Sequence, residues 1–89
     1  MCRVIDLVKT GKNIERLLRE RGLTARDVQQ RLGFAERRPV YFWIQGKNLP
    51  SINNLFMLAE MLRVSIDEIL ITKDEYRQQR SVNEDDRNT

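Results

Sequence analysis

The sequence contains no histidine and a single cysteine, Cys2, among its 89 residues. One cysteine cannot form an intrachain disulfide, and without histidine the usual zinc sites and general bases are missing. Long hydrophobic runs are also absent, because Asp6 and Lys9 interrupt the apolar stretch near the N-terminus before it reaches the length of a signal-peptide core or membrane span. We therefore expect a cytoplasmic protein with no metal, cofactor or membrane partner.

The chain is also short for an enzyme. Its 89 residues leave room for one compact domain, and a domain of this size buries only roughly 60% of its unfolded surface. Such a core cannot easily enclose a deep, water-free catalytic chamber. The sequence also lacks a cofactor-binding loop and paired carboxylates at catalytic spacing, so we expect no catalysis.

Charge divides the chain into two parts. The 16 basic and 13 acidic residues give a net charge of +3. Residues 73–89 hold four basic and five acidic side chains, which leaves +4 on residues 1–72. We expect residues 1–72 to form the folded domain, and residues 73–89 to be a charged tail that begins as a frayed helix and becomes disordered. The basic excess of the folded part fits a polyanionic partner.

Five segments have the apolar spacing of amphipathic helices. Four of the expected ranges are 10–21, 24–33, 51–62 and 65–70, and the third helix has Pro39 in its first turn and ends at Gly46. Hydroxyl residues suited to N-caps and glycines suited to helix ends mark most of the boundaries: Thr24, Ser51, Ser65, Gly22, Gly33 and Gly46. In the fourth helix, the side chains expected to point inward are Ile52, Leu55, Leu58, Ala59 and Leu62. The sequence thus predicts an all-α, compact five-helix bundle, with residues 4–8 either extended across it or beginning its first helix.

The second and third expected helices are short, are joined by a turn that contains Gly33, and the third opens with Arg37 and Arg38. A helix-turn-helix requires this arrangement, because one helix braces across the DNA backbone while the next presents side chains to the major groove. The pattern alone therefore favours DNA binding.

Three segments strengthen this interpretation: residues 23–34, 40–51 and 55–70. The most specific features are the Gly46-x-x-x-Pro50 loop and the apolar pattern that ends in Val64-Ser65-x-Asp67. With these motifs the chain resembles the phage repressor/Cro, or XRE, family of helix-turn-helix proteins over roughly residues 10–72. The resemblance implies a repressor-like, sequence-specific regulator of transcription that binds double-stranded DNA, often as a homodimer.

The resemblance also assigns roles to individual residues. It places the recognition helix at about residues 36–45, with Arg37 and Arg38 contacting bases or phosphates and Tyr41 reaching a base edge, a thymine methyl group or a phosphate. The expected phosphate contacts are Lys47, Asn48, Ser51 and Asn53.

Gln29 is a further candidate for DNA contact, although it departs from the family pattern. It stands where the family usually has Ala or Gly, and the interval from Gly33 to Gly46 is one residue longer than the commonest spacing. We expect the longer turn to give the Gln29 side chain space.

Several apolar residues have two interpretations. Trp43 is expected in the core, whereas Phe42 and Ile44 either cover the core or contact a partner. Met57 and Met61 pack on the fourth helix or take part in dimerisation. The alternative function is a protein-interaction module of the same fold, an antitoxin-like or anti-repressor partner with weak DNA binding. Such a module would contact its partner through the charged tail or through four apolar side chains: Phe42, Ile44, Met57 and Met61.

Overall fold

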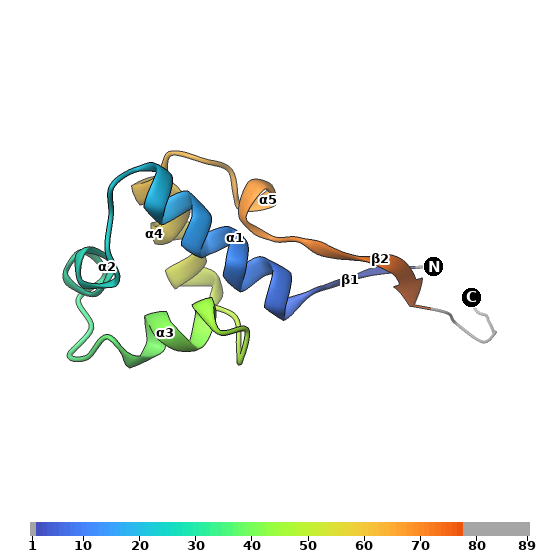
Figure 1. Cartoon of the computed structure of the whole chain (residues 1–89), viewed down its shortest axis with the longest axis horizontal. Helices are drawn as coiled ribbons and strands as arrows, with labels where there is room; N and C mark the ends of the chain where they lie inside the picture. Colours follow the sequence, from blue (N-terminus) through green and yellow to red (C-terminus); the bar gives the residue numbers. More distant parts are fainter. Residues whose placement is uncertain (1, 78–89) are drawn as a thin grey trace.

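The computed structural model describes residues 2–77, which fold into five helices and a two-stranded antiparallel sheet (Figure 1). In chain order the elements are β1 (Cys2–Ile5), α1 (Leu7–Glu20), α2 (Ala25–Leu32), α3 (Arg38–Ile44), α4 (Ile52–Leu62), α5 (Ile66–Ile69) and β2 (Thr72–Arg77). The predicted five-helix bundle is confirmed. The sheet, which extends from one end of the bundle, is an addition that the sequence patterns did not reveal.

The first helix begins earlier than predicted, at Leu7 instead of about residue 10. Asp6 is its N-cap, and its carboxylate accepts a hydrogen bond from the Lys9 amide at 2.9 Å. A carboxylate at this position satisfies one of the amides that a helix leaves unpaired in its first turn. The stretch from Val4 to Val8 therefore divides: its first residues are strand and its last two begin α1.

Three predicted N-caps and the predicted glycine end of α2 are confirmed, whereas the third helix begins at Arg38 instead of about residue 36. The hydroxyls of Thr24, Ser51 and Ser65 each accept a hydrogen bond from the amide three residues later. Gly33 ends α2 in the left-handed conformation with φ of 78°, which glycine adopts without the steric cost of a Cβ atom.

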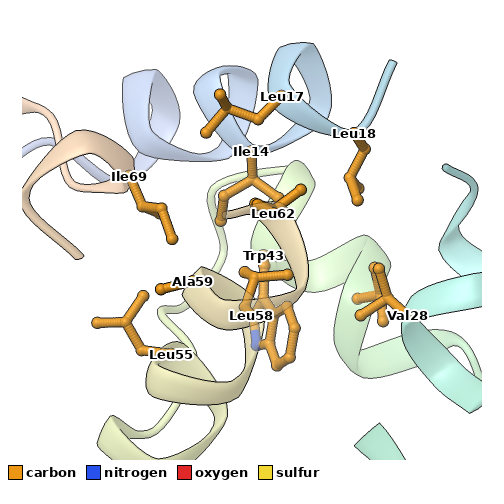
Figure 2. Close-up of a cluster of buried hydrophobic side chains, with 11 residues drawn as sticks. Ile14, Leu17, Leu18, Val28, Trp43, Leu55, Leu58, Ala59, Leu62 and Ile69 are labelled. Carbon is orange, nitrogen blue, oxygen red and sulfur yellow. The ribbon is translucent and has the colours of Figure 1, made fainter. Parts of the chain in front are cut away.

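The apolar faces of all five helices meet in one core (Figure 2). Its buried members are Ile14, Leu17, Leu18, Val28, Val40, Trp43, Leu55, Leu58, Ala59, Leu62 and Ile69. Trp43 is 4% exposed, which confirms its predicted core position. The prediction for Ile52 is wrong, because its side chain is 84% exposed. Ile52 is the first residue of α4 and lies on the flank of the buried stripe, beyond the reach of the core.

The expected frayed helix at the start of the tail is also wrong. Thr72–Arg77 is a strand that pairs with Cys2–Ile5, in a register that sets Arg3 opposite Tyr76 and Ile5 opposite Thr72, with an irregularity between them. A polar segment without a core of its own is thus ordered by backbone pairing with β1. The remainder of the predicted tail, residues 78–89, lies outside the described residues.

Two buried polar residues of α1 hold the segment that precedes β2. The Asn13 amide nitrogen donates to the carbonyls of Glu68 and Ile69 at 2.8 and 3.0 Å. The Thr10 hydroxyl accepts from the Ile71 amide at 2.9 Å and donates to the carbonyl of the same residue at 3.3 Å. These bonds satisfy backbone groups that α5 leaves unpaired, and they fix the end of the domain against α1.

Gly11 brings α1 against the end of α3. A Cβ atom at this position would collide with the carbonyl oxygens of Trp43 and Ile44. The absent side chain therefore sets how closely α1 and α3 approach each other, and hence how α3 is held.

No helix within residues 2–77 combines the length and apolarity needed to cross a bilayer. In the same range, no three His, Cys, Asp or Glu side chains are grouped so that they could hold a metal ion.

Candidate nucleic-acid interface

The helices α2 and α3 are joined by residues 33–37 and are locked together by packing. Val28 of α2 and Val40 of α3 are fully buried. The Phe34 ring in the connecting loop meets the Trp43 ring edge-to-face, with 5.7 Å between centroids and 70° between planes. Aromatic rings favour this geometry. The orientation of α3 is therefore fixed by the core and not by the loop alone.

Gln29 makes its hydrogen bonds within the protein. Its amide nitrogen donates to the carbonyls of Phe34 and Ala35 at 3.3 and 3.1 Å, two backbone groups of the α2–α3 loop. The large residue at a usually small position thus braces the longer turn. The predicted DNA contact of Gln29 would compete with these two bonds.

The start of α2 carries a capping box. The Asp27 carboxylate accepts from the Thr24 amide at 2.7 Å and from the Thr24 hydroxyl at 3.0 Å, while the Asp27 amide donates to that hydroxyl. The backbone bond first, and then the hydroxyl bond, hold the pKa of Asp27 below its ordinary value of 3.8. This carboxylate anchors the helix that supports α3.

The recognition helix that was predicted at about residues 36–45 is found as α3. Its N-cap, Arg37, has no side-chain cap bond, and Pro39 occupies the first turn, where a missing amide hydrogen costs little. Val40 and Trp43 face the core, while Arg37, Arg38 and Tyr41 are exposed, with Tyr41 44% accessible. Three of the predicted contact residues are therefore available to a ligand on the outer side of α3.

Gln45 is an exposed residue of this surface that sequence reasoning missed. It is the C-cap of α3 and follows Tyr41 by four residues, so the two side chains lie on one helix face. This spacing of four residues is the sequence signal that could have identified Gln45. An exposed glutamine amide can both donate to and accept from a base edge.

Arg38 has an acidic neighbour. One of its terminal nitrogens lies 3.8 Å from a Glu36 carboxylate oxygen, and both side chains are largely exposed. This pair is a weak surface contact that a stronger anion can displace. Glu36 was not predicted as a functional residue, because only the structure shows that its carboxylate lies close to the Arg38 guanidinium.

The loop after α3 adds a second cation. The Lys47 ammonium lies 5.2 Å from the centroid of the Phe42 ring, the distance of a cation–π contact. Lys47 and Asn48 are both exposed. The loop therefore places a positive charge beside the outer face of α3.

The two predicted contacts at the start of α4, Ser51 and Asn53, are exposed, and both also have local bonds. The Ser51 hydroxyl accepts from the Asn54 amide at 3.2 Å, and the Asn53 amide nitrogen lies 3.8 Å from the sulfur of Met57. Met57 is half-buried, and Met61 packs against the core together with Ile44. Of the two interpretations of Ile44 and Met61, packing against the core is therefore the one that the structure supports.

A hollow of about 580 Å³ lies beside α3. It brings together Arg38 and Phe42 of α3, Asn48 of the next loop and Glu36 of the preceding one. Its apolar wall is formed by Phe34, Pro39, Phe42, Trp43 and Leu49. Arg37, Tyr41 and Lys47 do not line it. The exposed side of α3 therefore borders a mostly apolar recess with charged residues at its edge.

Comparison with known proteins places this geometry in context. A family model described as helix-turn-helix matches residues 14–69. The chain is 37% identical over 65 residues to the uncharacterized HTH-type transcriptional regulator y4dJ of Sinorhizobium fredii, a match that covers 73% of this chain and 83% of the relative.

Three solved structures have a similar fold: a controller protein, a DNA-binding domain and a transcriptional regulator. The restriction-modification controller protein C.AhdI of Aeromonas hydrophila is 28% identical, with a TM-score of 0.65 over 72% of this chain and 96% of that protein. The DNA-binding domain of BldD, at 18% identity, has a TM-score of 0.62 over 74% of this chain and 94% of that domain. A transcriptional regulator from Listeria innocua, at 23%, has a TM-score of 0.63 over 90% of this chain and 70% of that protein. The last two likenesses concern the fold alone.

Proposed function

The chain belongs to the helix-turn-helix family, and on that premise we propose that it is a non-catalytic, sequence-specific DNA-binding regulator of transcription. It reads the major groove with α3, in the manner of a repressor. The restriction-modification controller protein C.AhdI, at 28% identity, supports this assignment.

The observation that carries the proposal is the two-sided character of α3. Val40 and Trp43 anchor it in the core, and the opposite side presents Arg38, Tyr41 and Gln45 to solvent. Because the core holds this helix in place, its backbone loses little conformational entropy when the helix enters a groove.

The residues then have different roles. Arg37 and Arg38 contact base edges, where a guanidinium can bond guanine O6 and N7 together, and Tyr41 and Gln45 extend the read sequence. Lys47, Asn48 and Asn53 contact phosphates, and Ser51 helps by setting the N-terminus of α4, whose amides favour an anion. Gln29 supports α3 through the loop carbonyls it already bonds.

The experiment is selection of bound duplexes from a random pool, followed by affinity measurements on the selected sequence. Arg38→Ala should cost about 1–3 kcal/mol and relax the preference at one base position. Lys47→Ala should weaken binding to all sequences alike and lower the slope of log K against log salt by about 1.

Identical effects of the two substitutions would contradict this division of roles. A pool from which no sequence is enriched would contradict sequence-specific regulation and favour the alternative, an interaction module that binds a protein partner.

We further propose that the active form is a homodimer, joined through the outer face of α4. Ile52 is 84% and Phe56 53% exposed on this face. Phe56 lines a mostly apolar hollow of about 430 Å³, whose other lining residues are Ala59, Glu60, Arg63, Val64, Ser65, Ile66 and Asp67. A two-fold interface must be complementary to itself, and this face carries both a projecting ring and a recess, and both signs of charge.

A further inference from the structure

We propose that Phe42 is a specificity-determining residue of this protein, whose ring receives the C5-methyl group of a thymine beside the base read by Arg38. This inference rests on the proposed function, since it requires α3 to enter the major groove. It gives a role to an apolar side chain that the resemblance to repressors left unassigned.

The position of Phe42 on α3 is the first argument. Phe42 follows Arg38 by four residues, so its ring lies one turn further along the same exposed side. One turn rises 5.4 Å, and successive base pairs are 3.4 Å apart. The base next to Phe42 is therefore one or two steps from the base next to Arg38.

The surroundings of the ring are the second argument. Phe42 is only partly buried, and the hollow of about 580 Å³ that it lines with Arg38 and Asn48 is mostly apolar. The Lys47 ammonium lies 5.2 Å from the ring centroid. A cation suited to phosphate and a guanidinium suited to a base thus flank the ring, so a duplex held by both would bring its groove edge to the hollow.

The chemistry of the groove selects the occupant. Base edges in the major groove present hydrogen-bond donors and acceptors, with one apolar group, the thymine methyl. A polar base edge placed against Phe42 and Leu49 would lose its water without a hydrogen bond in return, which is unfavourable. The thymine methyl group makes no hydrogen bonds to water that it could lose, and the burial of its apolar surface is favourable.

The test replaces each thymine of the selected duplex, one at a time, by deoxyuridine, which lacks only the methyl group. The wild-type protein should bind about fourfold more weakly at one thymine per half-site, located one or two steps from the base whose preference Arg38→Ala relaxes. Fourfold corresponds to the ~0.8 kcal/mol of one buried methylene group, at 1.4 kcal/mol per tenfold.

Two variants assign the effect to the ring. Phe42→Ala should bind the thymine and uracil duplexes equally at that position, whereas Phe42→Leu, which keeps an apolar side chain, should retain most of the discrimination. Thermal unfolding of both variants reports whether the fold is intact. The uracil series on the wild-type protein needs no variant, so it is informative even if Phe42→Ala unfolds.

The outcomes separate the two proposals. Binding to a selected duplex that is indifferent to uracil at every thymine would overturn the role of Phe42 and leave the proposed function standing. A penalty that persists in folded Phe42→Ala would also overturn it. The absence of any selected duplex would overturn the proposed function itself. It would overturn the thymine contact as well, and would favour the alternative in which Phe42 contacts a protein partner.

Discussion

Glu36 illustrates how a single residue can tune an otherwise basic surface. Its carboxylate lies 3.8 Å from Arg38 at the start of α3. In the DNA complex that we propose, the Glu36 carboxylate would compete with DNA for the guanidinium and repel nearby phosphates. We therefore expect this carboxylate to lower the affinity for DNA of any sequence, so that the correct base contacts contribute a larger share of the binding.

Glu36→Gln should accordingly increase affinity for random-sequence duplexes by about 1.4- to 5-fold, the range of an exposed charge pair of 0.2–1 kcal/mol. Fluorescence anisotropy at fixed salt measures this change. Glu20→Gln is a matched control, because Glu20 also loses an exposed partner, Arg16 at 2.8 Å, but on α1. An equal gain in both variants would mean that net charge alone, and not the position of Glu36, controls binding.

The contact of α1 with α3 leaves no space for an added side-chain atom at Gly11. In an exposed helix, alanine is more favourable than glycine by about 1 kcal/mol. Gly11 of α1 is buried against the Trp43 and Ile44 carbonyls, where a methyl group has no space. Steric overlap at this site outweighs helix propensity.

Gly11→Ala should therefore destabilise the protein by about 1–3 kcal/mol, and should weaken DNA binding because α3 must shift. Chemical denaturation and duplex titration measure the two effects. Lys12→Ala, at the exposed neighbouring position, should leave stability nearly unchanged. A Gly11→Ala variant more stable than the wild type would contradict this prediction, because it would show that α1 and α3 can move apart without a loss of packing energy.

The helix α2 depends on a carboxylate at its start. Because the pKa of Asp27 is lowered by its bonds to Thr24, its contribution to stability is fully present above about pH 4 and is lost as the pH falls through the lowered pKa. Asp27→Asn should thus be less stable than the wild type at pH 7, and the difference should shrink towards pH 3. Thermal unfolding across this range measures it. A difference that is constant with pH would contradict a charge-dependent cap.

For the molecule as a whole, the outer face of α4 determines the assembly that we propose. Phe56→Glu should abolish the dimer, because it places a charge in the apolar recess, and should leave the core intact because Phe56 is exposed. Sedimentation measures the mass, and duplex titration should show weaker binding to a two-half-site operator.

Val8→Glu is the matched control for Phe56→Glu, since Val8 is a 52% exposed apolar residue on α1. It should leave the mass unchanged. Selected duplexes with two half-sites about one helical turn apart would be the corresponding signature on DNA. A wild-type protein that remains monomeric on a single half-site would contradict the dimer.

The sequence by itself determined the helices and most of the core. Caps and glycine ends act over three or four residues, as Thr24, Ser51 and Gly33 illustrate, so local chemistry is sufficient to define them. The spacing of apolar residues likewise identified Val40 and Trp43 as the buried side of α3. The exposed positions of Arg37, Arg38 and Tyr41 were expected from the resemblance to the repressor family, and their DNA contacts stay predictions.

Only the tertiary structure decided the features that join residues far apart in the chain. The pairing of β1 with β2, the bonds from Asn13 to Glu68 and Ile69, and the approach of Gly11 to α3 each depend on backbone groups brought together by folding. The exposure of Ile52 was also decided by the tertiary structure. The spacing of apolar residues identifies the face of a helix that is buried, but it does not determine how far the neighbouring helices extend along that face. The hollow beside Phe42 likewise exists only once α3 and its two flanking loops have packed.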